Sequence, residues 1–388
     1  MVIAYFVFKK RVIINSVLRT PYLVLKKNGM HLQPIFENKK RPILIAGPCS
    51  AETEEQVMET AAQLAAEGGV DAFRAGIWKP RTRPGQFEGV GAPGLKWMQQ
   101  VRKEYGFKIT TEVANHAQVF DALKANVDIL WIGARTTVNP FSVQEVADAL
   151  KGVDIPVMIK NPINPDLELW IGAIERLYNA GITRIAAIHR GFSSHQKGEY
   201  RNEPMWEYPI ELMRRFPDLQ MINDPSHICG NRHMLQMVAQ KAMDLNFDGV
   251  IMETHRDPDN AWSDAKQQVV PARLLEIIHE LVVRDEKSDD LIVAQTLDNL
   301  RGKINELDAD LLTLLGNRMK IAEQIGEFKR DNKISIYQQS RWSEILDKAV
   351  AKGQTLGLSD GFVVSILSAI HQESINHQAK VMNESIKI

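Results

Sequence analysis

Eight short apolar segments alternate with amphipathic segments between residues 43 and 284, and this alternation restricts the possible folds more than any other feature. A short apolar run bounded by turn residues predicts a buried strand, and apolar residues spaced three and four apart predict a helix. The predicted strands are 43–48, 71–76, 108–113, 127–132, 156–160, 184–189, 219–223 and 248–253. The predicted helices are 54–67, 94–105, 115–125, 141–150, 166–180, 207–216, 230–245 and 271–284.

Eight strand–helix units in about 250 residues match the size of a (β/α)8 TIM barrel, an α/β fold in which parallel strands close into a ring. A doubly wound open sheet is the alternative, but no Gly-x-Gly-x-x-Gly follows the first strand. We therefore predict a barrel over residues 35–285, with Gln33–Phe36 as a short strand that plugs its floor.

An N-terminal extension, residues 1–34, precedes the predicted barrel. Its apolar start, residues 1–8, is far shorter than the roughly 20 residues of a membrane span. It also lacks the basic segment with which a signal peptide begins. Our hypothesis is that Met30 is the natural start, or that this arm is loosely ordered. The only cysteines, Cys49 and Cys229, form no disulfide framework, so we expect a reducing, cytoplasmic location.

A polar residue that can bind an anion or a cation stands at the end of every predicted strand or just beyond it. In chain order these residues are Cys49; Arg74 with Lys79, Arg81 and Thr82; Glu112; Arg135; Lys160; Arg190; Asp224 with His227; and Glu253 with Asp264. A parallel barrel gathers the carboxyl ends of its strands at one mouth, where active sites of this fold lie. A single charged residue at a strand end is usually only solvated. Because all eight predicted strands have a polar residue of this kind at or just beyond their end, we predict a shared binding site.

The cations of this mouth predict the kind of ligand. Lys and Arg total 47 against 48 Asp and Glu, so the whole chain has no excess charge to attract a nucleic acid or a membrane. Several cations at one mouth repel each other unless anions neutralise them, and phosphate and carboxylate are their natural partners. We therefore expect small polyanionic substrates.

A second set of residues at the mouth predicts a metal site. Cys49, His227, Glu253 and Asp264 supply a thiolate, an imidazole and two carboxylates, a mixed set suited to a divalent transition metal. Ligand softness makes zinc plausible, and the two carboxylates leave room for manganese or iron. We expect a divalent ion, with manganese first and iron, zinc or cobalt as the alternatives. The alternative for each residue alone is structural, since a lone buried cysteine usually packs as an apolar residue.

Five motifs in this order resemble the 3-deoxy-D-arabino-heptulosonate-7-phosphate (DAHP) synthase family, in its compact class I β-type, over about residues 35–285. The motifs are Gly-Pro-Cys-Ser at 47–50, Lys-Pro-Arg-Thr at 79–82, Gly-Ala-Arg-Thr-Thr at 133–137, Asp-Pro-Ser-His at 224–227 and Ile-Met-Glu at 251–253. The resemblance implies condensation of phosphoenolpyruvate with erythrose 4-phosphate, the entry step of the shikimate pathway of aromatic amino-acid synthesis.

The same resemblance implies the roles of the residues. Cys49, His227, Glu253 and Asp264 would hold the metal. Arg74 and Lys160 would bind the carboxylate of phosphoenolpyruvate, and Arg135 and Arg190 its phosphate. Lys79, Arg81 and Thr82 would bind the aldose phosphate, with Lys79 near the aldehyde. Glu112 and Asp224 would complete the substrate site.

A related synthase, which makes 3-deoxy-D-manno-octulosonate 8-phosphate, is the alternative for the barrel. Those enzymes typically carry a Lys-Ala-Asn-Arg-Ser type loop that contacts the aldose, where this chain has Lys-Pro-Arg-Thr at 79–82. The loop therefore favours the four-carbon aldose phosphate.

A small all-α domain of three helices is predicted beyond a charged linker at 286–295. Leu297, Leu300, Ile304, Leu307, Leu311 and Leu314 recur at spacings of three and four, which predicts a long helix. Further helical patterns cover 338–352 and 359–383, and the domain spans 296–388.

Cations interrupt the apolar stripe of the long helix. Arg318 and Lys329 are about three turns apart and share a face. A cation on such a stripe is costly without an anion, so the face predicts an anionic ligand. Arg301 lies roughly 25 Å before Arg318 and about 100° around the helix, so it reaches the same ligand only from a second subunit. Ser374 and Gln378, four residues apart, share a face of the last helix.

Residues 296–382 resemble an all-helical chorismate mutase, in which two intertwined chains build two sites. The resemblance implies that Arg318 and Lys329 are catalytic and that the chain forms a homodimer or a higher homo-oligomer. The residues that match ligand-binding positions of that family are Arg301, Arg318, Lys329, Arg341, Ser374 and Gln378. Gln338 and Trp342 depart from it, because relatives often carry acidic residues there.

Three interpretations of the helical domain stay open. It converts chorismate to prephenate, it senses prephenate or chorismate and inhibits the barrel, or it is a solvated coiled-coil spacer. The first two are compatible, and the fused arrangement resembles relatives in which such a domain confers feedback inhibition.

Overall fold

The computed structural model describes residues 30–37, 40–79, 85, 87–194, 198–285, 287 and 289–383. The chain divides into two compact units, Met1–Glu286 and Lys287–Ile388, and each is described by itself. The predictions for residues 1–29 lie outside the described residues.

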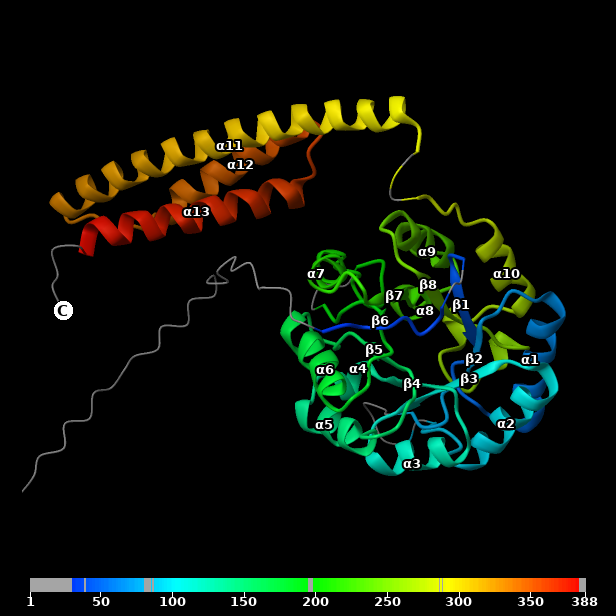
Figure 1. Ribbon diagram of the computed structural model, residues 1–388. Helices are drawn as coiled ribbons and strands as arrows, with labels where there is room; N and C mark the ends of the chain where they lie inside the picture. The colour runs from blue at the N-terminus through cyan, green and yellow to red at the C-terminus, as the bar shows by residue number, and fades with distance from the viewer. Residues whose placement is uncertain are drawn as a thin grey trace, which may run out of the picture. The chain divides into compact units, whose positions relative to one another are not determined.

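The first unit is a closed barrel of eight parallel strands, which confirms the predicted TIM barrel (Figure 1). The strands follow one another in chain order, and β8 closes the ring against β1 with Gly47 opposite Glu253. They are β1 (Ile43–Gly47), β2 (Ala72–Arg74), β3 (Lys108–Val113), β4 (Ile129–Ile132), β5 (Val157–Lys160), β6 (Ile185–His189), β7 (Gln220–Asn223) and β8 (Gly249–Glu253). Each strand lies within the range predicted for it.

Helices surround the barrel (Figure 1). They are α1 (Glu54–Glu67), α2 (Pro93–Tyr105), α3 (His116–Lys124), α5 (Pro140–Ala149), α6 (Leu167–Asn179), α7 (Glu207–Arg215), α9 (Leu235–Asp244) and α10 (Pro271–His279). Capping explains where several begin, because Thr53, Asn115 and Asp166 each accept a hydrogen bond from the backbone amide three residues later.

Short helices at the mouth correct the predicted boundaries. α4 (Ala134–Thr137) and α8 (Pro225–Cys229) were not predicted, and the helix predicted over 230–245 begins only at Leu235. The reason is Gly230, which ends α8 in the left-handed conformation with φ 65°. The helix predicted to reach 284 ends at His279, and two 3-10 helices, η1 (Pro258–Asn260) and η2 (Ala265–Gln267), follow β8. Helices of three to five residues are too short to show a helical period.

The floor of the barrel is covered by Ile35 and Phe36, which are buried in one cluster with inward-facing strand residues such as Ile45 and Trp131. The side-chain oxygen Oε1 of Gln220 accepts hydrogen bonds from the backbone amides of Ile35 and Phe36, at 2.8 and 3.2 Å. The segment Gln33–Phe36 forms a single β-bridge from Gln33 to Arg184 and not the predicted strand. It nevertheless closes the end of the barrel opposite to the mouth.

Within its described residues, the second unit contains three helices, as predicted, namely α11 (Leu291–Asp331), α12 (Gln339–Thr355) and α13 (Asp360–Asn383). The Asp290 carboxylate accepts hydrogen bonds from the amides of Ile292 and Val293, so α11 begins inside the segment 286–295 that was predicted as a linker. α13 packs against α11 where Gly326 lies, since a Cβ there would be 2.9 Å from the Cα of Gln378.

We predict that Gly326→Val loosens this packing, because the added atoms overlap Val381 and the α13 backbone. Overpacking of this kind costs roughly 1–3 kcal/mol. Hydrogen exchange of α13 peptides in the full chain should accelerate. Gly316→Val is the matched control on the same helix, because nothing lies within 4 Å of its Cβ position. Equal exchange in the two variants would contradict the packing argument.

Candidate active site and metal centre

The position of Cys49 follows from the way β1 ends. Gly47 has φ 150°, and a Cβ there would lie 2.0 Å from the Arg74 carbonyl oxygen, so only glycine lets β1 pass this close to β2. Beyond this point Ser50 pairs with Gly76 in a parallel bridge. The thiol of Cys49 is therefore fully buried at the mouth of the barrel.

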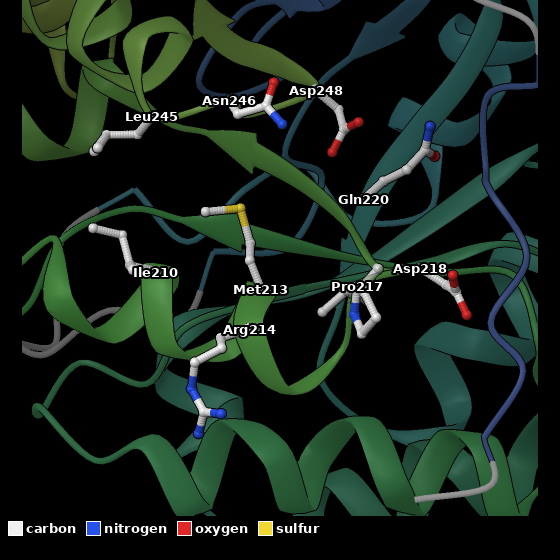
Figure 2. A pocket seen from close by; sticks show the side chains of 10 residues that line it. Ile210, Met213, Arg214, Pro217, Asp218, Gln220, Leu245, Asn246 and Asp248 are labelled. Carbon is white, nitrogen blue, oxygen red and sulfur yellow. The ribbon is translucent and has the colours of Figure 1, made fainter. Parts of the chain in front are cut away.

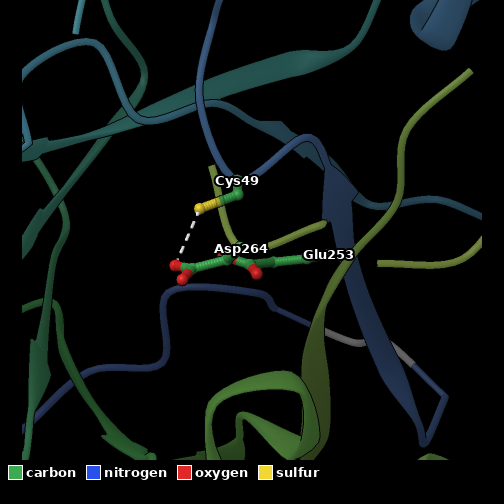
Figure 3. A group of neighbouring side chains, drawn as sticks. All are labelled: Cys49, Glu253 and Asp264. Carbon is green, nitrogen blue, oxygen red and sulfur yellow. Dashed lines mark hydrogen bonds between the residues drawn. The ribbon is translucent and has the colours of Figure 1, made fainter. Parts of the chain in front are cut away.

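Three of the four predicted metal ligands lie together. One ligand atom each from Cys49, Glu253 and Asp264 falls within 4.8 Å of the others (Figure 3). The Cys49 thiol donates to Asp264 Oδ2 at 3.3 Å. Burial raises the pKa of this thiol to about 12, helped by the Glu253 carboxylate, so the thiol is protonated until a cation displaces its proton.

These residues fit a divalent cation. Glu253 Oε1 is buried and, among the described residues, has no hydrogen-bond partner, although Arg74 Nη1 lies 3.2 Å away. A buried carboxylate oxygen without a hydrogen bond is costly unless another group satisfies it. A cation held between this oxygen, Asp264 and the Cys49 sulfur would do so, and a thiolate with two carboxylates is a donor set for such an ion.

His227 lies at the edge of this cluster. Its Nε2 is 3.8 Å from Glu253 Oε1, and its Nδ1 is 3.0 Å from Asp224 Oδ1. The ionised Asp224 carboxylate accepts a hydrogen bond from Nδ1–H of His227, which leaves the Nε2 lone pair on the side of Glu253. This arrangement is common behind metal-binding histidines. Burial lowers the pKa of His227, which keeps the ring neutral and able to bind a cation.

The cations of β2 and β5 converge beside the metal residues. The Arg74 guanidinium and the Lys160 ammonium lie 5.0 and 5.9 Å from the centre of the same Trp131 ring. Lys160 Nζ is 2.8 Å from Asp224 Oδ2. Burial would raise the pKa of Asp224, but His227 and Lys160 outweigh burial and hold it well below its usual range. Two buried cations therefore face one side of the mouth.

Lys79 connects the cations to the metal residues. Its Nζ donates to the Cys49 carbonyl oxygen at 2.9 Å and to the Cys49 sulfur at 3.2 Å. Burial would lower the pKa of Lys79, but Cys49 and Glu253 outweigh burial and raise it, so this ammonium is charged at neutral pH. The other predicted residues of this loop, Arg81 and Thr82, lie outside the described residues.

Arg190 and Arg135 contribute to a second cationic region. Burial lowers the pKa of Arg190 to about 10, and the positive charges of Arg201 and Arg135 act in the same direction. Arg190 is buried, whereas Arg135, on α4, is exposed. Glu112 Oε2 accepts a hydrogen bond from Trp131 Nε1 at 3.0 Å and thus lies beside the first pair of cations.

Two residues of this site were missed by the sequence argument, Arg201 and Gln267. Arg201 Nη1 lies 3.1 Å from Asp264 Oδ1 and 2.7 Å from Gln267 Oε1. Neither residue directly follows a strand, so the strand-end signal could not identify them. The only sequence signal was their place in the segments after β6 and β8.

The helical unit brings together part of the predicted ligand set. Arg318 Nη1 donates to the Ser374 hydroxyl, and the nearby Gln378 has a buried Oε1 without a hydrogen-bond partner among the described residues. Lys329 donates to the Ile336 carbonyl at 2.6 Å and lines a cavity of about 350 Å³ with Gln338. Burial lowers the pKa of Lys329.

Arg301 and Arg341 do not join this group within one chain. Arg301 pairs with Asp298, and Arg341 with Glu344, in exposed ion pairs along their own helices. Trp342, the other departure noted in the sequence, stacks on His371 with ring centres 4.0 Å apart. One chain therefore groups Arg318, Ser374 and Gln378 as a candidate anion site, while Lys329 lies with Gln338 at the cavity in the same unit.

A further cavity lies away from the mouth. It has a volume of about 440 Å³ and lies where β7 and β8 begin, between α7 and the chain after α9 (Figure 2). Its polar lining includes Arg214, Gln220 and Asp248, and none of the predicted site residues contributes to it.

Family comparisons agree with both units. Residues 27–287 match the model of the DAHP synthetase I family, and residues 300–379 match that of chorismate mutase type II. A phospho-2-dehydro-3-deoxyheptonate aldolase from Thermotoga maritima is 32% identical over 238 residues, which cover 61% of this chain and 68% of the relative. A 2-dehydro-3-deoxyphosphooctonate aldolase from Desulfotalea psychrophila is 27% identical over 282 residues, covering 68% of this chain and 96% of the relative.

Solved structures agree with the barrel. A crystal structure of the Thermotoga maritima phospho-2-dehydro-3-deoxyheptonate aldolase (DAHP synthase) matches with a TM-score of 0.56 at 30% identity, covering 62% of this chain and 67% of that one. A truncated form of the 3-deoxy-D-arabino-heptulosonate 7-phosphate synthase from the same organism matches with a TM-score of 0.54 at 28% identity, covering 62% and 84%. Within the part of the chain that the structure describes, no helix is long and apolar enough to span a membrane.

Proposed function

Because the chain belongs to the DAHP synthetase I family and carries a chorismate mutase type II domain after it, we propose that its barrel joins phosphoenolpyruvate to erythrose 4-phosphate in a metal-dependent reaction. Both resemblances inferred from the sequence are confirmed. The observation that carries the proposal is the pairing of buried cations with a buried Cys–carboxylate cluster at one mouth. Such a mouth suits two phosphorylated substrates and a divalent ion.

Different residues of the mouth bind the different anionic groups of the two substrates. Arg74 and Lys160, which flank Trp131, bind the carboxylate of phosphoenolpyruvate, and Arg190 with Arg135 binds its phosphate. Arg81 and Thr82 bind the phosphate of the aldose. This arrangement fixes the enol carbon against the aldehyde, and holding two reactants in the right geometry removes much of the entropic barrier.

The chemistry forms one carbon–carbon bond and releases phosphate. The enol carbon attacks the aldehyde carbon, water adds to the carbon that bears the phosphate, and the C–O bond to phosphate then breaks. Lys79, a charged ammonium 3.2 Å from the Cys49 sulfur, donates a proton to the new alkoxide. A divalent ion held by Cys49, His227, Glu253 and Asp264, with manganese as our first choice, supplies Lewis acidity at the aldehyde.

An assay with both candidate aldoses tests this function. The metal-free protein is given Mn²⁺ and phosphoenolpyruvate with either erythrose 4-phosphate or arabinose 5-phosphate, and release of phosphate is measured. We expect turnover with the four-carbon substrate and a loss of turnover with a chelator. Preference for the five-carbon substrate would contradict the assignment and support the octulosonate alternative.

For the helical unit we propose mutase activity in a homodimer. Arg318, Lys329, Ser374 and Gln378 bind the two carboxylates of chorismate in a compact conformer, and the rearrangement then needs no nucleophile. The first half of α11 supports the dimer, because Leu297, Leu300, Ile304, Leu307, Leu311 and Leu314 are all exposed on a single chain.

Mixing two inactive variants tests the shared site. We predict that Arg301→Ala and Arg318→Ala each lose mutase activity, and that a refolded equimolar mixture regains about a quarter of the wild-type rate. The reason is that half of the dimers are mixed, and in each of these one of the two sites has both arginines. No recovery in a mixture shown to exchange subunits would contradict the placement of Arg301 in the partner's site.

Regulation is a further part of the proposal. The same dicarboxylate site binds prephenate, and its occupation lowers the rate of the barrel. Coupling of this kind requires two states of the chain with different ligand affinities. The assay above, repeated with prephenate or chorismate, measures it directly.

A further inference from the structure

Glu253 and Asp264, two of the proposed metal ligands, each have one carboxylate oxygen that accepts a hydrogen bond from a side chain outside the proposed ligand set. Gln267 Nε2 donates to Glu253 Oε2 at 2.6 Å, and Arg201 Nη1 donates to Asp264 Oδ1 at 3.1 Å. Arg201 also donates to Gln267 Oε1 at 2.7 Å, so one continuous bridge runs from Asp264 to Glu253. Gln267 is almost completely buried.

The other oxygen of each carboxylate faces the metal cluster. Asp264 Oδ2 accepts from the Cys49 thiol at 3.3 Å, and Glu253 Oε1 has no hydrogen-bond partner among the described residues. Each carboxylate therefore has one oxygen committed to the bridge and one oriented toward the place where a cation would lie. Free carboxylates bind cations through one oxygen or two, so this restriction has a chemical consequence.

Two glycines make room for the loop that supplies Arg201. Gly230 has φ 65°, and a Cβ there would lie 2.5 Å from the Cβ of Arg201. Gly191 has φ 75°, and a Cβ there would lie 2.6 Å from the carbonyl oxygen of Asn202. Both are left-handed positions that favour glycine, and both allow close packing of the loop on its neighbours.

Asn202 extends the bridge to the remaining parts of the site. Its Oδ1 accepts from Arg190 Nη1 at 2.8 Å, and its Nδ2 donates to the His227 carbonyl oxygen at 2.6 Å. The dipeptide Arg201–Asn202 thus contacts the cation proposed for phosphate, the backbone of the proposed histidine ligand and one carboxylate ligand. This one loop segment therefore fixes the position of the proposed phosphate-binding cation relative to the proposed metal ligands.

We propose that Arg201 and Gln267 are positioning residues that restrict Asp264 and Glu253 to one oxygen each at the divalent cation, an inference that rests on the metal centre of the proposed function. Partners behind metal ligands typically change metal affinity by 10–100-fold when they are removed. Loss of the bridge releases the second oxygen of each carboxylate, and both the affinity and the symmetry of the bound ion change.

Arg201→Met and Gln267→Met in the full chain test the proposal. Calorimetric titration of the metal-free proteins with Mn²⁺ should give dissociation constants about tenfold or more above that of the wild type. The low-temperature EPR spectrum of the bound Mn²⁺ should also change its zero-field splitting, at metal concentrations that saturate each variant. A residue that only stabilises the fold would leave this spectrum unaltered.

Arg232→Met is the matched control. Arg232 donates to the carbonyl oxygens of Gln268 and Ala265 and so holds the same loop from its backbone, without touching a carboxylate ligand. We expect its Mn²⁺ affinity to stay within about twofold of the wild type. Wild-type affinity and spectra in the two bridge variants, or an equal loss in Arg232→Met, would overturn the inference. Absence of Mn²⁺ binding by the wild-type chain would instead overturn the proposed metal centre.

Discussion

Replacing Cys49 with alanine is expected to abolish metal binding and DAHP synthase turnover together. The thiol is fully buried and donates to Asp264, so its removal takes away the one soft ligand of the cluster. The Lewis acidity of a bound ion contributes several kcal/mol to such a reaction. Because each 1.36 kcal/mol is a factor of ten, kcat should fall by about 10³-fold or more. Phosphate release and Mn²⁺ titration of the same preparation measure the two losses.

Cys229→Ala is the control for this experiment. Cys229 is the other buried free cysteine, and burial raises the pKa of its thiol to about 12, but it is not part of the metal cluster. We expect this variant to keep wild-type Mn²⁺ affinity and turnover. A fully active Cys49→Ala protein would refute the assignment of the metal centre.

Replacing Arg318 with alanine is expected to abolish mutase turnover and to remove inhibition of the barrel by prephenate. The guanidinium is held by Ser374 on the face that carries Gln378, where it would meet a ligand carboxylate. Truncating one partner of a hydrogen-bonded charge pair of this kind typically costs about 2–5 kcal/mol. Mutase activity should therefore fall by at least about 30-fold, as measured by the disappearance of chorismate.

Lys320→Ala is the matched control on the same helix, since Lys320 is an exposed cation two residues away. It should leave both mutase activity and prephenate inhibition as in the wild type. Prephenate inhibition that persists in Arg318→Ala at wild-type concentrations would separate the inhibitor site from the mutase site and contradict the proposal.

The barrel could be predicted from sequence because its signals are long and regular. Each strand is a continuous apolar run, and closing a parallel ring brings strand ends together whatever their separation in the chain. Cys49, just beyond β1, and Glu253, the last residue of β8, come close for this reason. The same argument predicted that Arg74 and Lys160 share one mouth, and the structure adds that both lie over the Trp131 ring.

The parts that were missed depend on local turns. α4 and α8, which carry Arg135 and His227, are shorter than two helical turns and come directly after a strand. Helices of this length show no recurring apolar spacing in the sequence, so the pattern cannot predict them. Arg201 reaches the Asp264 carboxylate because the chain after β6 returns to pair Phe192 with Glu203. A strand-end rule cannot identify a residue whose position depends on such a return.

The helical unit was predicted from its period, but its site was predicted only in part. Arg318 and Ser374 meet because α11 and α13 pack at Gly326, a contact made within one chain. Arg301 lies on the part of α11 whose leucines are exposed, and its place in a ligand site belongs to the proposed homodimer. The rise and turn of a straight helix are enough to predict that Arg301 and Arg318 of one chain lie too far apart to bind the same small ligand.

Anomalous diffraction from crystals of the full chain grown with Mn²⁺ and phosphoenolpyruvate tests the central claim most directly. The account predicts one manganese peak within about 2.6 Å of the Cys49 sulfur and of carboxylate oxygens of Glu253 and Asp264. It also predicts that the carboxylate of phosphoenolpyruvate lies between Arg74 and Lys160. A manganese peak elsewhere, or phosphoenolpyruvate bound away from these two cations, would contradict it.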